Sequence, residues 1–350
     1  MSDPHAKWAT WHEIHQQPDI WRSWGSALDV AALRDWVAAQ SFDVVWFCGA
    51  GSSAYIGDML AAALPGTRSV PTTDIVADPA HLLSGAKPLV VSFGRSGNSA
   101  ETIGTLDALD ALLPLAPRLN ITCNKDSALA TRASRAPTKC VVLPEATHDA
   151  GFAMTSSLST MLLTALAIFD APCDVSARLN TLADSLDDLL PQFLPAGRPE
   201  RVVYVGTGPL AFAAREAALK VMELSAGQIP ALWDSTLGFR HGPKAFVTDG
   251  TAITIFTGAR HPGSAYDADL ASELRQQFPK ARVETIGPGG NIDVPMPFGP
   301  VWAAPLCIAA AQMRGVSWSD ELGLNVDDPF AGKSTLSRVV AGVKLYPVTG

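Results

Sequence analysis

The chain has 350 residues with a formal net charge of −8, and 47 % of its residues are hydrophobic against 17 % charged. This length exceeds one ordinary hydrophobic core and predicts two domains, while the composition is typical of a folded globular protein and excludes a disordered one. Because no run of lysines or arginines occurs, we do not expect nucleic-acid binding, which depends on neutralising phosphates. A small anionic ligand needs only a few local hydrogen-bond donors, so the net negative charge of the chain does not exclude one.

Export and membrane insertion are not expected. The N-terminal stretch MSDPHAKWATWHEIHQQPD has no apolar core, so it does not read as a signal peptide. The longest apolar runs, such as MLLTALAIF from Met161, are too short to span a bilayer, and we expect no membrane association. The cysteines lack CxxC spacing and are expected to be reduced: Cys48, Cys123, Cys140, Cys173 and Cys307. Together these features predict a cytoplasmic protein.

In the first half of the chain, strand-like runs alternate with helical patterns after an expected N-terminal helical arm at 1–40. DVVWFCGAG from Asp43 reads as a strand followed by the helix SAYIGDMLAAAL, and PLVVSFG from Pro88 is followed by SAETIGTLDALDALL. RLNITC from Arg118 and KCVVLPE from Lys139 continue the series. Apolar strands separated by helices predict an α/β fold, with a parallel sheet covered by helices on both faces.

The second half repeats this pattern after two helices and a linker. The helical run FAMTSSLSTMLLTALAIF begins at Phe152, a second helix reaches about Leu194, and PAGRPE follows as the linker. RVVYVGTGPLAFAAREAALK then matches DVVWFCGAGSSAYIGDMLAA, with Gly49 and Gly206 at equivalent positions. Later strands are predicted at AITIFTG and ARVETIG. We predict a tandem duplication with a first domain at 41–194 and a second at 200–350.

Both copies carry the pattern G-x-G-x-x-A between strand and helix, as GAGSSA from Gly49 and GTGPLA from Gly206. Backbone N–H groups at such a helix start bind anions, and a tight turn alone is the alternative for the second copy. In the first copy, two helix starts at one sheet edge are rich in hydroxyls and hold one arginine. The polar residues there are Ser52, Ser53, Arg95, Ser96, Asn98 and Ser99. We predict a phosphomonoester site, because no acidic ribose anchor follows a strand about 20 residues on.

The segment REAALKVMELSAG from Arg215 predicts a largely buried helix with one charged stripe. Glu216, Lys220 and Glu223 lie at i, i+4 and i+7 on one face, among apolar residues. Burying carboxylates is costly, so the stripe predicts a functional face. The alternative is an ion-pair ladder, since Glu216 to Lys220 has the favourable i, i+4 orientation.

These segments resemble the sugar isomerase (SIS) family, and within it the tagatose-6-phosphate ketose/aldose isomerases, also described as galactosamine-6-phosphate deaminase/isomerases. The resemblance covers nearly the whole chain, and its longest motifs are SFGRSGNS from Ser92, GFAMTSS from Gly151 and GFRHGPK from Gly238. It implies two tandem SIS domains, each with a parallel sheet, and a homodimer. It also implies a small phosphosugar as the ligand.

The resemblance assigns roles to individual residues. From the family's glucosamine-6-phosphate synthase, it implies that Ser53, Ser96 and Ser99 hold the phosphate. It implies that Glu223 is the catalytic base and that His241 opens the sugar ring, with a structural histidine as the alternative. The synthase's C-terminal lysine aligns with Ala341, with Lys344 nearby.

Four other polar residues in these motifs each have two alternative roles. Thr155 and Ser156 are expected to contact substrate hydroxyls, or else to cap a helix. Arg240 and Lys244 are surface charges or secondary anion contacts.

The implied activity converts galactosamine 6-phosphate to tagatose 6-phosphate and ammonia, by proton transfer from C2 to C1 and hydrolysis of the imine. Lys220 would lend positive charge to the developing oxyanion and pair with Glu216. Glucosamine 6-phosphate as the substrate, a simple isomerase and a non-catalytic sugar-phosphate sensor are the alternatives. No metal or cofactor is expected, because HEIH at 12–15 lacks zinc-helix spacing and FAGKST lacks the first P-loop glycine.

Overall fold

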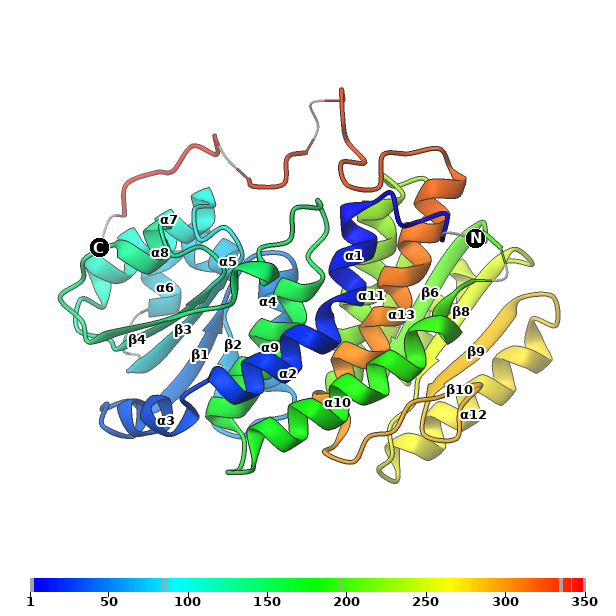
Figure 1. The fold of residues 1–350 in the computed structure, drawn as a ribbon, viewed down its shortest axis with the longest axis horizontal. Helices are drawn as coiled ribbons and strands as arrows, with labels where there is room; N and C mark the ends of the chain where they lie inside the picture. The colour runs from blue at the N-terminus through cyan, green and yellow to red at the C-terminus, as the bar shows by residue number, and fades with distance from the viewer. Residues whose placement is uncertain are drawn as a thin grey trace.

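The structure, a computed structural model, describes residues 3–83, 85, 87–195, 197–333, 336–340 and 342–348. Within these residues the chain forms two five-stranded sheets, and the paired strands of both are parallel (Figure 1). This confirms the predicted α/β class with two parallel sheets.

The first sheet has the strand order β2-β1-β3-β4-β5. Its strands are β1 (Val44–Cys48), β2 (Thr67–Ser69), β3 (Pro88–Gly94), β4 (Arg118–Thr122) and β5 (Thr138–Val142). Its helices are α4 (Ser52–Ala61), α5 (Thr72–Ala77), α6 (Pro79–Leu83), α7 (Ala100–Leu112) and α8 (Ala128–Thr131). After β1 the next strand is added on one side, and from β3 onward strands are added on the other side. The turns after β1 and β3 therefore flank the point where ligands bind in such sheets.

The second sheet has the order β10-β9-β8-β6-β7. Its strands are β6 (Arg201–Gly206), β7 (Ala231–Ser235), β8 (Thr251–Phe256), β9 (Arg282–Gly287) and β10 (Ile292–Asp293), and its helices are α11 (Pro209–Leu224) and α12 (Gly263–Gln277). If β6 to β10 are renumbered 1 to 5, this order becomes 5-4-3-1-2. Read from the other edge it is 2-1-3-4-5, the order of the first sheet. The predicted repetition of one α/β unit is therefore confirmed.

Three strands lie outside the sequence prediction, and all three are edge strands. β2 and β10 contain only three and two residues, and β7 mixes Trp233, Asp234 and Ser235 in one short run. An edge strand is partly solvated, so its sequence lacks a continuous apolar run. By contrast β3, which is buried over its whole length, is apolar except for Ser92, and this pattern identifies it.

Helices fill the space between the two sheets (Figure 1). They include α1 (Ala9–His15), α2 (Gln17–Ala27), α9 (Ser156–Phe169), α10 (Val175–Leu189) and α13 (Pro300–Glu321), while α3 (Val30–Ala38) lies beside the first sheet. Short 3-10 turns are η1 (Glu145–Thr147), η2 (Leu190–Phe193), η3 (Gly238–His241) and η4 (Pro243–Phe246). The helix predicted from Phe152 thus begins later, and it is buried from Ser156 to Ile168, which explains its uninterrupted apolar run. No helix in the described part of the chain has the length and hydropathy to cross a membrane.

Two close approaches place the elements that build the site. A Cβ atom at Gly49 would lie 2.5 Å from the carbonyl carbon of Ser53, so only glycine permits the tight turn between β1 and α4. A Cβ atom at Gly315 in α13 would lie 2.6 Å from Leu224 Cδ1, so this glycine lets α11 pack directly on α13. α11 therefore sits rigidly between α13 and the first unit.

The segment after α13 runs back over the first sheet unit (Figure 1). The carbonyl of Val340 accepts the N–H of Ala100 at the start of α7 at 3.2 Å, and Leu345 lies against Gly104 in the same helix. The C-terminal segment follows the second unit in sequence and contacts the first. The domain bounds 41–194 and 200–350 stay predictions.

Candidate functional site

A cavity of about 240 Å³ lies at the reversal point of the first sheet. Its walls come from the turns after β1 and β3, the start of α7, the loop before α9, the end of α11 and the C-terminal segment. The lining residues are 50–53, 93–97, Ser99, Glu101, Thr102, Phe152, Met154, Glu223 and 336–340. The cavity thus brings together the predicted Ser52, Ser53, Arg95, Ser96, Ser99 and Glu223.

A second cavity of about 240 Å³ lies against β6, β8 and β9, away from both glycine turns. Its one carboxylate, Glu284, is paired with Arg314 through hydrogen bonds of 2.7 and 2.8 Å, and Arg282 donates to the carbonyl of Gly197. It offers neither an anion-binding turn nor a free base. We therefore place the candidate site at the first cavity.

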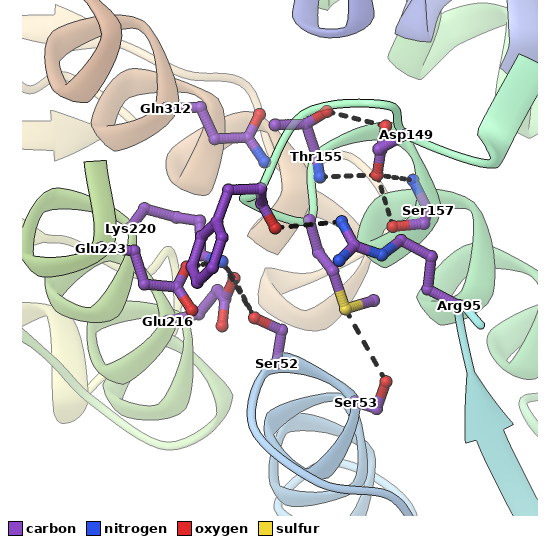
Figure 2. Close-up of polar contacts among 12 residues, drawn as sticks. Ser52, Ser53, Arg95, Asp149, Thr155, Ser157, Glu216, Lys220, Glu223 and Gln312 are labelled. Carbon is purple, nitrogen blue, oxygen red and sulfur yellow. Dashed lines mark hydrogen bonds and ion pairs between the residues drawn. The ribbon is translucent and has the colours of Figure 1, made fainter. Parts of the chain in front are cut away.

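The charged stripe of α11 faces the first residue of α4 (Figure 2). Lys220 Nζ lies 2.5 Å from Glu223 Oε2 and 3.3 Å from Glu216 Oε1. It also donates to Ser52 Oγ at 3.0 Å, and the Ser52 hydroxyl donates to Glu216 Oε1 at 3.0 Å. The Glu216–Lys220 ion pair that the alternative predicts is present. It belongs, however, to a network of four residues that joins the two sheet units.

Burial divides the three stripe residues into an inner pair and an outer carboxylate. The side chains of Glu216 and Lys220 have no exposed surface, whereas 22 % of the Glu223 side chain is exposed. Burial raises the pKa of Glu216 to about 7, and Lys220 offsets only part of that shift. Burial lowers the pKa of Lys220, but Glu216 and Glu223 outweigh it and raise this pKa overall, so Lys220 is an ammonium ion. Glu223 is the stripe carboxylate that reaches the cavity.

Ser53, Ser96 and Ser99 are among the hydroxyl residues that line the cavity at the starts of α4 and α7. Ser99 caps α7 by accepting the N–H of Thr102 at 3.2 Å, and Ser96 accepts the N–H of Asn98 at 3.3 Å. Ser53 makes a long contact of 3.9 Å with the sulfur of Met154. Hydroxyls at two helix N-termini form an environment that favours an anion. Asn98 is exposed and outside the lining, and its side-chain oxygen accepts the N–H of Ala128, so it positions α8.

Arg95 holds two other walls of the cavity together. Its guanidinium donates to the carbonyls of Gly151 and Phe152 at 3.1 Å each and to the carbonyl of Arg338 at 3.0 Å. Burial lowers the pKa of Arg95, and the nearby Asp149 acts in the opposite direction. Because these partners are neutral carbonyls, its positive charge stays available to a ligand anion. Arg95 therefore ties the loop before α9 to the C-terminal segment.

The loop before α9 is organised by Asp149, which is 1 % exposed (Figure 2). Its carboxylate accepts the backbone N–H groups and hydroxyls of Thr155, Ser156 and Ser157. The hydroxyls of Thr155 and Ser156 are therefore taken, and neither residue lines the cavity. Neither hydroxyl accepts a helix N–H group, so the carboxylate of Asp149 caps α9 in place of Thr155 and Ser156.

Several residues that shape the site escape the sequence analysis. Glu13 in α1 accepts the N–H groups of Ala150 and Gly151 at 2.5 and 3.1 Å, and the Arg338 side chain donates to the carbonyl of Asp149. Asp149 could have been suggested by its position ahead of the hydroxyl-rich TSS run, as a cap. Glu13 and Arg338 lie more than 130 residues from their partners, and no local pattern marks them.

His241 and its neighbours lie outside this cavity. His241 ends η3, is exposed and is not among the lining residues. Arg240 donates to Glu273 of α12 at 2.8 Å, and Lys244 also pairs with Glu273, which lowers the pKa of that carboxyl. Arg240 and Lys244 are thus engaged in ion pairs, as expected if they are surface charges and not anion contacts.

The glycine turn of the second unit holds an internal carboxylate. Asp267 of α12 is fully buried and accepts hydrogen bonds from the hydroxyls of Thr207 and Thr236 at 2.7 and 2.6 Å and from the N–H of Gly258 at 3.2 Å. This carboxylate accepts the Thr207 hydroxyl of the turn, and its negative charge disfavours a second anion there. The second turn is therefore structural.

The C-terminal lysine positions contribute no group to the cavity lining in the described residues. Ala341, the position aligned with the synthase's lysine, lies outside the described residues. Lys344 is exposed, and its Nζ lies 4.8 Å from the centroid of the Tyr346 ring.

The chain is similar to known proteins over its whole length. It is 36 % identical to the D-galactosamine-6-phosphate deaminase AgaS of Escherichia coli, with 97 % of this chain and 96 % of the relative covered. The AgaS protein of Shewanella sp. (strain ANA-3) is 34 % identical, with coverages of 96 % and 91 %. No protein-family model matches the chain.

Solved structures show the same similarity. The crystal structure of tagatose-6-phosphate ketose/aldose isomerase from Escherichia coli matches with a TM-score of 0.88 and 32 % identity over 100 % of both chains. A glucosamine-6-phosphate deaminase from Thermotoga maritima shares the fold, with a TM-score of 0.76 and 22 % identity over 95 % of this chain and 99 % of that chain.

Glu13 gives a pH-dependent stability that can be measured. Burial and the nearby Asp149 raise its pKa from 4.5 to about 7. The folded protein therefore holds this proton more tightly than the unfolded chain. The stability it contributes is fully present below pH 4.5 and is lost as the pH rises through about 7.

We expect the unfolding free energy of the wild type to fall by on the order of 2 kcal/mol between about pH 5 and 7.5 relative to Glu13→Gln. The glutamine keeps an acceptor for the two loop N–H groups but does not titrate. Urea unfolding of both proteins at both pH values measures the difference. Parallel pH profiles for the two proteins would contradict the assignment.

Proposed function

Since the chain belongs to the family of D-galactosamine-6-phosphate deaminases named AgaS, we propose that it converts galactosamine 6-phosphate and water to tagatose 6-phosphate and ammonia. In the open-chain aldose, a base removes the C2 proton to give an enolamine, and a proton returned to C1 gives a ketimine at C2. Water adds to the ketimine, and ammonia leaves. Acid, base and water suffice for these steps, so the proposal includes no metal or cofactor.

One observation carries the proposal: the accessible carboxylate of Glu223 and the hydroxyl-lined helix starts share one cavity. The phosphate is assigned to the starts of α4 and α7, where Ser53, Ser96 and Ser99 supply hydroxyls and the helix N-termini favour an anion. Arg95, buried beside them, adds a positive charge. This orientation directs C1 and C2 of the sugar toward the end of α11.

Glu223 is proposed as the base that moves the proton between C2 and C1. It lies at the cavity end of the charged stripe of α11 and keeps access to the cavity, as a general base must. The Lys220 ammonium beside it stabilises negative charge on the enolate-like intermediate, and Glu216 neutralises Lys220 from the buried side.

The proposal is tested by measuring ammonia release from galactosamine 6-phosphate and glucosamine 6-phosphate side by side, with the ketose identified. The two sugars differ only at C4. We expect ammonia and tagatose 6-phosphate from the galacto sugar. Release from the gluco sugar alone would move the chain to the alternative substrate, and tight binding without release would make it a sugar-phosphate sensor.

Glu223→Gln should lower kcat by roughly 100- to 10,000-fold while KM changes little, because the amide fills the same space without accepting a proton. The same steady-state ammonia assay measures both constants. Glu273→Gln is a matched control on the surface, where a carboxylate pairs with Arg240 and Lys244. A kcat close to that of the wild type in Glu223→Gln would rule out this residue as the base.

We also propose that the chain acts as a homodimer in the cytoplasm. His241 is exposed away from the cavity, so a second copy is the simplest source of a ring-opening histidine at Glu223. Met222 and Leu237 support this, because these apolar side chains near Glu223 and His241 are 43 % and 46 % exposed. The cytoplasm suits a charged, membrane-impermeant substrate and five unpaired cysteines.

Mixing two inactive variants tests the shared site. If Glu223 and His241 act across the dimer, a heterodimer of Glu223→Gln and His241→Ala holds one intact site. Unfolding, mixing and refolding equal amounts should restore about a quarter of wild-type activity, the statistical share of intact sites. A mixture as inactive as its components would contradict a histidine supplied by a second copy.

A further inference from the structure

Gly151 joins the N-terminal helix α1 to the cavity through its two backbone groups. Its N–H donates to Glu13 Oε1 of α1 at 3.1 Å, and the N–H of Ala150 donates to the same oxygen at 2.5 Å. Its carbonyl accepts a hydrogen bond from Arg95 Nη1 at 3.1 Å. One loop residue therefore lies between a buried carboxylate of α1 and the guanidinium of a residue that lines the cavity.

The loop before α9 fits closely against α1. A Cβ atom at Gly151 would lie 2.3 Å from Thr10 Oγ1 and 3.0 Å from Glu13 Oε2, so a larger residue would push the loop away from the helix. α1 is itself held in place, because the Asp327 carboxylate accepts the N–H groups of Ala9 and Thr10 at 2.9 and 2.8 Å. The loop is thus seated on a helix that is anchored at its start.

We propose that Glu13 is a positioning residue that holds the loop before α9 and thereby keeps the Arg95 guanidinium in place for the phosphate of the substrate, an inference that rests on the proposed function. The guanidinium donates to three neutral backbone carbonyls, those of Gly151, Phe152 and Arg338. Among the described residues, these bonds take up both hydrogens of Nη1 and one of Nη2. The Nε–H and the second Nη2–H are left for an anion.

The surroundings of Glu13 are unfavourable for a carboxylate that has no role. Its side chain is buried, and Oε2 has no hydrogen-bond partner among the described residues, which costs free energy. The nearby Asp149 and Asp327 carry the same sign of charge and do not stabilise it. In the described part of the chain, its hydrogen bonds go only to the two loop N–H groups. The contribution of Glu13 therefore lies in the position of the loop.

The first test compares Glu13→Ala with Glu13→Gln. We expect Glu13→Ala to raise KM by roughly 10-fold with kcat within about twofold, because the displaced guanidinium weakens phosphate binding and leaves the base in place. Glu13→Gln keeps an acceptor for the two N–H groups and should hold KM within about twofold of the wild type. Ile14→Val is the matched control, since it removes one methyl group from a fully buried neighbour in α1 and should lower Tm without changing KM.

A double-mutant cycle tests whether Glu13 acts through Arg95. Arg95→Ala should itself raise KM. In that background Glu13→Ala should add less than about twofold, because the group that Glu13 positions is gone. If the two separate effects on KM multiply, Glu13 acts by another route and the proposal is overturned. An unchanged KM in Glu13→Ala would overturn it equally.

Gly151→Ala gives the same test if Glu13→Ala does not fold. It keeps the Glu13 and Arg95 side chains and moves the loop away from α1. We expect a rise in KM similar to that of Glu13→Ala. A folded Gly151→Ala protein with the KM of the wild type would show that the seat on α1 does not matter for binding, and the proposal would fail.

Binding of inorganic phosphate, measured by isothermal titration calorimetry, needs no turnover. We expect the Kd for phosphate to rise by roughly 10-fold in Glu13→Ala and to match the wild type in Glu13→Gln and Ile14→Val. Equal Kd values, or binding by none of the four proteins, would overturn the proposal. If the wild type releases no ammonia but this pattern of Kd values is found, the proposed function fails and the role of Glu13 stands.

Discussion

The buried ammonium of Lys220 is the constraint on which the rest of the site depends. A charge removed from water is stable only beside paired and hydrogen-bonded partners, and removing one partner of such a pair costs about 3–5 kcal/mol. Two partners of Lys220 lie on its own helix, but the third, Ser52, belongs to the other sheet unit. Satisfying this one charge therefore fixes α11 against α4, and the cavity is the space that remains at their contact.

The duplicated fold explains why one unit binds and the other supplies the base. Both units place a glycine turn at the reversal point of their sheet, and both turns are equally tight. In the second unit the buried carboxylate of Asp267 lies beside the turn and accepts the Thr207 hydroxyl, the Thr236 hydroxyl and the N–H of Gly258. In the first unit the corresponding donors line an open cavity. α11 of the second unit therefore binds no anion at its own turn, and its charged residues face the first unit.

Much of this architecture follows from local sequence patterns. Apolar strands such as β3, the glycine turns and the charged stripe of α11 all predict their structure, because each depends on residues a few positions apart. The hydroxyl-rich starts of α4 and α7 lie at one cavity, as expected of two consecutive strand ends at one sheet edge. Of the four edge strands, β2, β7 and β10 lie outside the prediction because they are short or carry no continuous apolar run, whereas β5 is predicted.

Other features depend on contacts between distant segments, which no local pattern encodes. Ser52 and Ser53 are indistinguishable in the sequence, and only the placement of α11 separates their roles. Thr155 and Ser156 match a substrate-binding pattern, yet Asp149 takes their hydroxyls. The C-terminal segment reaches the cavity through Arg338, 243 residues after its partner Arg95.

The most direct test of this account is a crystal structure of Glu223→Gln with galactosamine 6-phosphate bound. The account predicts the phosphate at the starts of α4 and α7, beside Ser53, Ser96 and Ser99. It predicts C2 within about 3–3.5 Å of the side chain at position 223. A sugar phosphate bound at the Asp267 turn, or one with C2 remote from position 223, would contradict it.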